Sequence, residues 1–336
     1  MKPAYTTGRR FIHFFLPAPP NQKIYWVGDY NHWECRRALR YSEKDGGYNF
    51  RLPAQKDGIY FYKYVVNGNW MLDPRNPRSI PNGPFGTNSC ALMPGYRFPR
   101  EVQPDFKVPR GKVEALECKG TRLRKPREIY VYRPPHTSDS EELPLIVLQD
   151  GRECVEHLPL PDLFDKIIAQ KICRPFMAVM VSPLGPQQRD QDYIFNDTFE
   201  DFLPRDLIKL VRERYGITKN RKERAILGWS LGGLVSVRCA IRHPDVYGLA
   251  GGESSAFWPR NGRIYEEVIH QTPLSTSFYL GCGDMDGGEQ LSMLMAEIFG
   301  HLGIHHKLKL SNGGHEWFYW RTHLRHSLAW FFPQRP

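Results

Sequence analysis

One serine in this sequence lies where a nucleophile for acyl transfer would be expected. Ser230 is in the middle of RAILGWSLGGL (224–234), with Gly228 before it and Gly232 after it. The apolar residues 225–227 predict a strand before the serine and the residues after it predict a helix, which is the context of a nucleophile elbow. Side chains at either glycine would collide in such a sharp turn. The alternative is a serine that only caps the helix.

A serine nucleophile needs a base to accept its proton and an acid to orient that base. His315 follows a predicted strand and two glycines and precedes the last predicted helix, so we interpret it as the base. A histidine at a helix start with no chemical task is the alternative. The acid should come from FYLGCGDMDGGEQ, where we predict Asp286, with Asp284 second. Glu289 is also available, and each of these acids could instead cap the next helix.

Two backbone amides must stabilise the negative charge that develops on the carbonyl oxygen. The amide of Leu231, directly after the serine, is one expected donor. The other is expected from the loop after LPLIVLQDG, where the amide of Arg152 follows Asp150 and Gly151. Both residues would act through the main chain, so their side chains are weakly constrained.

The elements that must position these groups form two parts. Residues 1–93 contain short β-type runs separated by D-G-G, D-G and N-G turns, which predicts a small antiparallel, immunoglobulin-like sandwich. Residues 94–111 include four prolines and are predicted to be a linker. From 112 to 336, apolar strands alternate with helical segments, which predicts an α/β domain with a mostly parallel sheet. One long amphipathic helix is expected over 198–216.

Composition excludes several classes of protein. The 336 residues include no apolar run of about 18, so no membrane span is expected. The N-terminus lacks the apolar core of a signal peptide, which favours a cytoplasmic location. The seven cysteines form no C-x-x-C pair and no H-E-x-x-H occurs, so we expect reduced thiols and no metal. The chemistry outlined above needs no cofactor.

The net charge of +10 is concentrated in the N-terminal part. Residues 1–125 hold 22 Lys and Arg against 10 Asp and Glu, whereas the remainder holds 24 against 26. No nucleic-acid-binding motif accompanies this charge, so solvated surface charge is the favoured explanation and no nucleic-acid partner is predicted.

Six short motifs lie along the second part of the chain: LQDG, QQRDQDYIFN, GWSLGG, SSAFW, CGDMD and GGHEWFYWR. With them, residues 112–334 resemble the esterase D group of α/β-hydrolases, and particularly the enterochelin esterases. The resemblance implies Ser230 as nucleophile and His315 as base. It also implies Asp286, three positions after Gly283, as the acid.

The same resemblance suggests two substrate contacts. The family has an Arg-x-x-Glu-Leu segment that helps to hold substrate, and Arg189 matches its arginine, although Asp192 and Tyr193 replace the acid and the leucine. Arg189 is therefore predicted to contact an anion, a solvent-exposed loop arginine being the alternative. Trp258 is predicted to wall the pocket and stack on an aromatic acyl group. An ordinary core tryptophan is its alternative.

The first part resembles a different family. VGDYNHW, DGIYFYKYVVNGNWMLDPRNP and FGTNS are similar to the glycogen-binding module of AMP-activated kinase and starch-branching enzymes, although the last loop is one residue shorter than in the kinase. The resemblance implies that Trp33 and Trp70 stack on sugar rings while Lys63 and Asn88 bind hydroxyls. A module that only packs beside the catalytic domain is the alternative.

These observations favour a serine carboxylic-ester hydrolase with a small-molecule substrate. The enterochelin-esterase resemblance suggests a ferric siderophore whose backbone esters are cleaved, although the second part has no basic excess to attract an anion. The sugar-module resemblance suggests instead a carbohydrate esterase acting on acetyl or feruloyl esters. A non-catalytic glycan-binding protein is the hypothesis from another class.

Overall fold

The computed structural model describes residues 4–334 except 9–10, 54–56, 105 and 120. Its contacts divide the chain into two compact units. The sandwich unit comprises Met1–Phe98, Gly283–Gly287 and Ser311–Tyr319. The α/β unit comprises Pro99–Cys282, Gly288–Leu310 and Trp320–Pro336. Two short segments from the second half of the sequence therefore pack with the first unit.

The sandwich unit consists of two antiparallel sheets. Its strands are β1 (Tyr5–Thr7), β2 (Phe11–Leu16), β3 (Ile24–Gly28), β4 (Tyr41–Ser42), β5 (Gly47–Pro53), β6 (Ile59–Val66), β7 (Asn69–Met71), β8 (Ser79–Pro81) and β9 (Thr87–Leu92). One sheet has the order β1-β2-β5-β4. The other has the order β3-β6-β9-β8, with β7 paired to β6. The predicted N-terminal antiparallel β domain is confirmed.

Alternation along the strands builds the core of the sandwich unit. In β2, Ile12, Phe14 and Leu16 are buried while the residues between them are more exposed, as expected of a strand with one face on a core. Aromatic rings fill the interior, and Trp26 stacks on Phe50 with 4.5 Å between ring centroids. Short runs of this kind need such a shared apolar face to be stable.

The α/β unit is built on one mixed sheet. Its strands are β10 (Lys112–Cys118), β11 (Arg127–Arg133), β12 (Leu145–Gln149), β13 (Met177–Val181), β14 (Arg224–Trp229), β15 (Leu249–Glu253), β16 (Ser277–Gly283) and β17 (His306–Ser311). Their order is β10-β11-β13-β12-β14-β15-β16-β17. The neighbours from β13 through β12, β14 and β15 to β16 pair in parallel. Strand β11 pairs antiparallel with both of its neighbours, β10 and β13. Every residue of β12, β13 and β14 is buried, as continuous apolar strands in a covered sheet should be.

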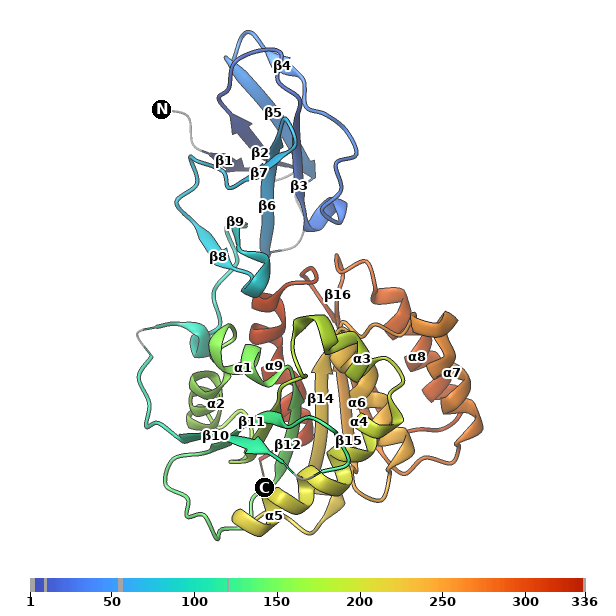
Figure 1. The fold of residues 1–336 in the computed structure, drawn as a ribbon. Coiled ribbons are helices and arrows are strands. Elements are labelled where there is room, and N and C mark those ends of the chain that lie inside the picture. Colours follow the sequence, from blue (N-terminus) through green and yellow to red (C-terminus); the bar gives the residue numbers. More distant parts are fainter. Residues whose placement is uncertain (1–3, 9–10, 54–56, 105, 120, 335–336) are drawn as a thin grey trace. The chain divides into compact units, whose positions relative to one another are not determined.

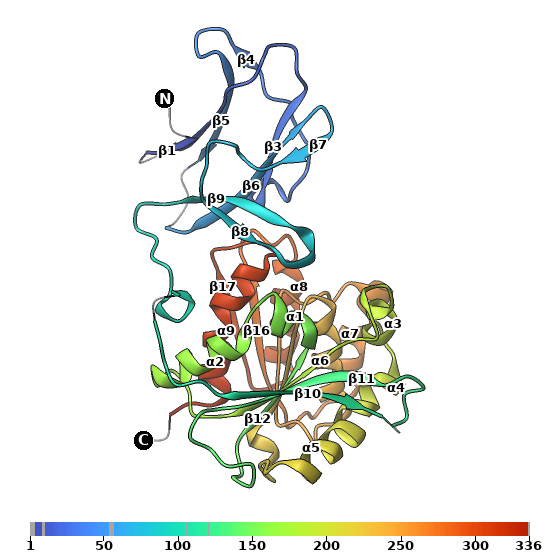
Figure 2. The same cartoon turned by 60° about the vertical axis from the view of Figure 1, so that its left-hand side comes forward.

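Helices cover both faces of this sheet. They are α1 (Gly151–Glu156), α2 (Leu160–Ala169), α3 (Arg189–Tyr193), α4 (Asp197–Phe202), α5 (Ile208–Arg214), α6 (Leu231–Arg242), α7 (Pro259–His270), α8 (Glu289–His301) and α9 (Trp317–Phe331). Helices α2 and α9 lie on one side of the sheet, and α4 and α6 lie on the other (Figures 1 and 2). The predicted α/β class is therefore confirmed.

The single long helix expected over 198–216 is wrong in detail. The chain instead forms α4, a π-helical segment at Leu203–Leu207 and then α5. Pro204 lies in the π-helical segment, and a proline has no N–H to donate to the preceding turn. The helical ladder widens there rather than ending.

The described part of the chain contains no helix that could span a membrane. None of the helices there combines the length and the apolar character needed to cross a bilayer.

Candidate active site

Ser230 occupies a strained turn between β14 and α6. Its backbone has φ 54° and ψ −123°, a region that residues with a side chain rarely adopt. The turn is held because the Ser230 amide donates to the Glu253 carbonyl (3.1 Å) and the Ala256 amide donates to the Ser230 carbonyl (3.0 Å). The Ser230 side chain makes no capping hydrogen bond to α6, so the helix-cap alternative finds no support.

The glycines of this turn are required by close backbone approach. A Cβ added to Gly228 would lie 2.3 Å from the Gly232 carbonyl oxygen, and one added to Gly233 would lie 2.3 Å from Ser255 Oγ. The backbone of Gly228 therefore packs directly on the first turn of α6. This explains physically why glycines flank the serine.

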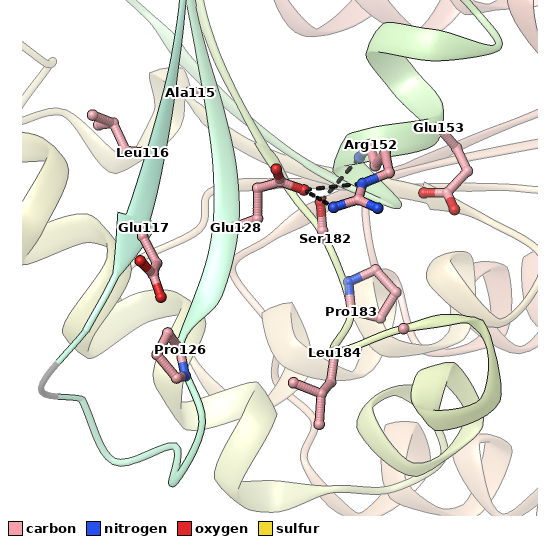
Figure 3. Close-up of a pocket in the computed structure, with 11 residues that line it drawn as sticks. Ala115, Leu116, Glu117, Pro126, Glu128, Arg152, Glu153, Ser182, Pro183 and Leu184 are labelled. Carbon is pink, nitrogen blue, oxygen red and sulfur yellow. Dashed lines mark hydrogen bonds and ion pairs between the residues drawn. The ribbon is translucent and has the colours of Figure 1, made fainter.

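The two predicted oxyanion donors lie in the α/β unit. Leu231 is the first residue of α6, so its amide has no acceptor one turn earlier in the helix. Arg152 lies in the first turn of α1, directly after Asp150 in the left-handed conformation and Gly151. The Arg152 amide donates to Ser182 Oγ at 3.0 Å (Figure 3). An oxyanion would have to share this donor with the Ser182 hydroxyl or displace it.

A pocket of about 500 Å³ lies beside Arg152. Figure 3 shows the Arg152 side chain reaching Glu128, to which Nη2 donates at 2.9 Å. The apolar part of the wall comes from Leu116 and Leu184, among other residues. Whatever occupied this pocket would meet an ion pair on one side and apolar side chains on the other.

Arg189 is only partly exposed, and its guanidinium is paired with a carboxylate. It forms two hydrogen bonds to the Asp150 carboxylate, from Nε (2.7 Å) and Nη2 (2.8 Å). Burial alone would lower the pKa of Arg189, but the carboxylate beside it raises the pKa above its ordinary value. The exposed-arginine alternative describes Arg189 only in part, because its guanidinium is paired with Asp150, the residue two positions before Arg152. Contact of Arg189 with a substrate anion stays a prediction.

Trp258 precedes α7, and its role was left open between pocket wall and core. The side chain is 60% exposed, which contradicts the core alternative. A large exposed indole is available for stacking, and its contact with an acyl group remains a prediction.

Asp286 and His315 meet in the sandwich unit. His315 Nδ1 lies 3.0 Å from Asp286 Oδ2, and the aspartate side chain is 3% exposed against 44% for the histidine. Asp284, the second candidate, instead accepts a hydrogen bond from the Gly313 amide (3.3 Å). Glu289 is the first residue of α8. The structure thus pairs the predicted base with Asp286, and a buried carboxylate is well suited to orient one imidazole tautomer.

The segment that carries His315 is anchored by aromatic packing. Phe318 lies 5.9 Å from Phe61, measured between ring centroids, and the Trp317 amide donates to Asn82 Oδ1 at 3.1 Å. Gly313 and Gly314 are tightly packed, and a Cβ on Gly314 would lie 2.6 Å from Asp29 Oδ1. The loop after β17 is therefore held by strands of the sandwich.

All four predicted sugar contacts line one pocket of about 500 Å³ in the sandwich unit. Indoles and a phenyl ring give it broad flat surfaces, and a lysine and two amides give it polar groups. His315 and Glu316 complete it. Its lining residues are Trp33, Lys63, Trp70, Asn82, Phe85, Asn88, His315 and Glu316. The resemblance to a sugar-binding module did not predict that the candidate base would share this pocket.

A buried pair of carboxyl groups was missed by sequence reasoning. Asp29 and Glu316 are almost fully buried neighbours, and Asn88 Nδ2 donates to Glu316 Oε2 at 3.1 Å. Burial raises the pKa of both carboxyl groups, and the neighbouring Asp29 raises that of Glu316 further. The sequence did offer one signal for these acids, because Asp29 lies within the motif VGDYNHW and Glu316 directly follows His315 in GGHEW.

Glu253 is a second buried acid that the sequence did not reveal. It is 1% exposed, and Oε1 has no hydrogen-bond partner among the described residues. Burial raises the pKa of Glu253 to about 8. Its backbone carbonyl accepts the Ser230 amide, so the Glu253 backbone lies directly beside the turn that carries Ser230.

Replacing Glu253 with glutamine should stabilise the protein at alkaline pH. The folded state keeps the Glu253 proton up to about pH 8, whereas the unfolded chain releases it near the ordinary value of 4.5. The folded state therefore binds more protons between these values, so the free energy of unfolding falls as pH rises through them. Glutamine removes this decline, giving a gain of about 2–4 kcal/mol by pH 8.

Urea unfolding of both proteins from pH 4 to 9 measures this gain. The matched control is Glu156→Gln, a change to an exposed glutamate on α1, which should leave the curve unchanged. A difference between Glu253→Gln and the native protein that does not vary with pH would contradict the assignment.

Comparisons with known proteins find esterases. The family model Esterase matches residues 120–331. An iron(III) enterobactin esterase of Escherichia coli K12 is 22% identical over 263 residues, which cover 74% of this chain and 64% of that protein. An endo-1,4-beta-xylanase/feruloyl esterase of Xylanibacter ruminicola is 24% identical over 303 residues, which cover 83% of this chain and 39% of that protein. The matched part is thus less than two thirds of each of these two relatives.

A solved structure shares the fold over nearly the whole chain. The enterobactin esterase of Shigella flexneri, determined in the presence of enterobactin, matches with a TM-score of 0.80 at 15% identity. The match covers 97% of this chain and 95% of that one.

Proposed function

Because this chain belongs to the Esterase family and is a carboxylic ester hydrolase, we propose that it acts through a Ser230, His315 and Asp286 triad. The observation that carries the proposal is the backbone of Ser230, held at positive φ between a buried strand and a helix. The hydrogen bond from His315 to Asp286 supports it. So does chain order, since serine, acid and histidine follow β14, β16 and β17 in turn.

In this mechanism, Ser230 Oγ attacks the ester carbonyl while His315 Nε2 accepts its proton. The Nδ1 side of the ring is held by Asp286, which stabilises the imidazolium that forms. The Leu231 and Arg152 amides stabilise the oxyanion. His315 then returns the proton to the departing alcohol, and a water molecule activated by the same histidine releases the acid from Ser230. No cofactor takes part in these steps.

Arg189 contributes to this mechanism through Asp150. Its two hydrogen bonds fix the Asp150 carboxylate, and the Tyr193 hydroxyl accepts the Asp150 amide proton at 3.0 Å. This bracing keeps the turn before Arg152 in its left-handed conformation. Trp258, exposed beside α7, is proposed to stack on the acyl group.

For the substrate, we propose a siderophore ester, as in the relatives named for iron(III) enterobactin. The rival is a carbohydrate ester with a feruloyl or acetyl group, favoured by the pocket that joins Trp33, Lys63, Trp70 and Asn88 to His315. One relative is named in part as a feruloyl esterase. Membership of an enzyme family removes the non-catalytic alternative.

Parallel assays decide between these substrates. A ferric trilactone siderophore and a feruloylated oligosaccharide are offered separately to the native protein and to His315→Ala, and the products are separated by chromatography. We expect ring-opened siderophore fragments from the native protein only. Release of ferulate with an intact trilactone would establish the carbohydrate esterase instead, and cleavage of neither would contradict both substrate proposals.

A further inference from the structure

A second pocket of the α/β unit, of about 370 Å³, has cationic side chains as half of its lining residues. We call it the basic pocket. Arg224, which lines it, is the first residue of β14, and Ser230 follows the opposite end of that strand. At about 3.3 Å per residue the two positions are roughly 20 Å apart. The lining residues are Pro204, Arg205, Ile208, Lys209, Arg212, Glu213, Arg224 and Val246.

Three cations of the basic pocket recur along one helical run. Arg205 lies in the π-helical segment and Lys209 and Arg212 lie in α5, so they follow one another about one turn apart. Pro204 and Ile208, on the same run, are buried beneath them. This arrangement gives the pocket an apolar floor and a cationic rim.

These cations have few acidic partners. Within the described residues, neither Arg205 nor Arg212 forms an ion pair, and Lys209 approaches Glu213 only at 4.0 Å on an exposed surface. Arg205 also lines an adjoining hollow, where Asp201 and Asp245 supply negative charge and Arg242 and His243 pair with Asp201 at 3.2 Å and 2.8 Å. The other cations of the basic pocket, Lys209, Arg212 and Arg224, share its lining with one acid, Glu213.

Arg224 is the unusual member of this group. It is 8% exposed, donates through Nη2 to the Lys219 carbonyl (3.1 Å), and has no hydrogen-bond partner for Nε within the described chain. Burial and the nearby Arg212 lower its pKa, and Asp245 only partly opposes them. Burying a guanidinium with unsatisfied donors and no paired carboxylate is costly. A bound anion would offset that cost.

We propose that the basic pocket binds a small phosphate-bearing molecule. Four cations face one lining carboxylate, so a ligand with two or more negative charges is favoured. Arginine presents a planar fork of donors that matches phosphate oxygens in pairs. A concave volume of this size suits a small ligand. A nucleic-acid backbone is a poor fit because Arg224 is too deeply buried to meet a broad surface.

Isothermal titration of the native protein with inorganic pyrophosphate, at low and constant ionic strength, tests this proposal. The test variant is Arg205→Ala/Arg212→Ala, which removes two exposed side chains and should leave the fold intact. The matched control is Arg214→Ala, an exposed cation on α5 that does not line the pocket. We expect saturable binding that weakens about tenfold or more in the double variant and about twofold or less in the control.

Three results of the pyrophosphate titration, and a fourth with a duplex oligonucleotide, would overturn the proposal. The first is no saturable binding to the native protein, and the second is equal binding by the double variant. The third is equal weakening by Arg214→Ala, which would indicate diffuse charge attraction. A duplex oligonucleotide titrated in parallel should not compete with pyrophosphate, and tighter binding of the duplex through Arg205 and Arg212 would replace the small ligand with nucleic acid. Ester hydrolysis is not needed for any of these readouts.

Discussion

Ser230→Ala is expected to lower kcat for a p-nitrophenyl ester by about 10⁴-fold or more, because no other group in the turn can form the acyl intermediate. The change removes only an oxygen atom, and alanine can occupy the same backbone turn at a cost similar to serine. Thermal unfolding should therefore shift little. Rates measured with enzyme in excess, over a single turnover, separate this loss from slow product release.

The control for this experiment is a serine inside the helix that follows Ser230. Ser236 is fully buried in α6, and its Oγ has no hydrogen-bond partner among the described residues. Ser236→Ala should keep activity close to that of the native protein. If Ser230→Ala retained more than about a tenth of the native rate, the elbow would not carry the nucleophile.

The second large effect is expected at the acid. Asp286→Asn should lower kcat by about 10²- to 10⁴-fold, because an amide cannot stabilise the imidazolium and favours the wrong histidine tautomer. The side chain is 3% exposed and asparagine has the same shape, so the fold should be kept. Activity on a p-nitrophenyl ester across a range of pH gives the readout.

Asp284 provides a matched comparison only two residues away. Its Oδ1 accepts the Gly313 amide, and an asparagine at this position retains that acceptor. Asp284→Asn should therefore change kcat by no more than about threefold. A larger loss in Asp284→Asn than in Asp286→Asn would transfer the role of the acid to Asp284.

Most regular elements of the α/β unit were predictable from local patterns. The stretches of β12, β13 and β14 are continuous apolar runs, and such runs mark buried parallel strands wherever helical segments alternate with them. In the sandwich unit, the strands β1, β4 and β8 have only two or three residues each, which is too short for alternation to predict their bounds. The π-helical widening inside the helix expected over 198–216 depends on how the chain accommodates Pro204, which periodicity does not reveal.

The candidate site was predictable in part for the same reason. The glycines around Ser230 indicate a tight turn with close backbone approach. The order of strand, serine and helix can be predicted from adjacent residues. The choice between Asp286 and Asp284 was open from the residues alone. It depends on which carboxylate the tertiary fold brings to His315 Nδ1, a contact between segments 29 residues apart.

The sequence by itself determined the tight glycine-flanked turn at Ser230 and the alternation of strands and helices, and it predicted His315 as the base, because each depends on neighbouring residues. Only the tertiary structure decided the partners of the ionisable groups. It pairs Arg189 with Asp150, brings the carboxyl groups of Asp29 and Glu316 together in a buried place, buries Glu253, and gives Arg224 Nε no hydrogen-bond partner among the described residues. Charge state and hydrogen bonding depend on burial and on groups distant in the chain, and neither can be read from a local pattern.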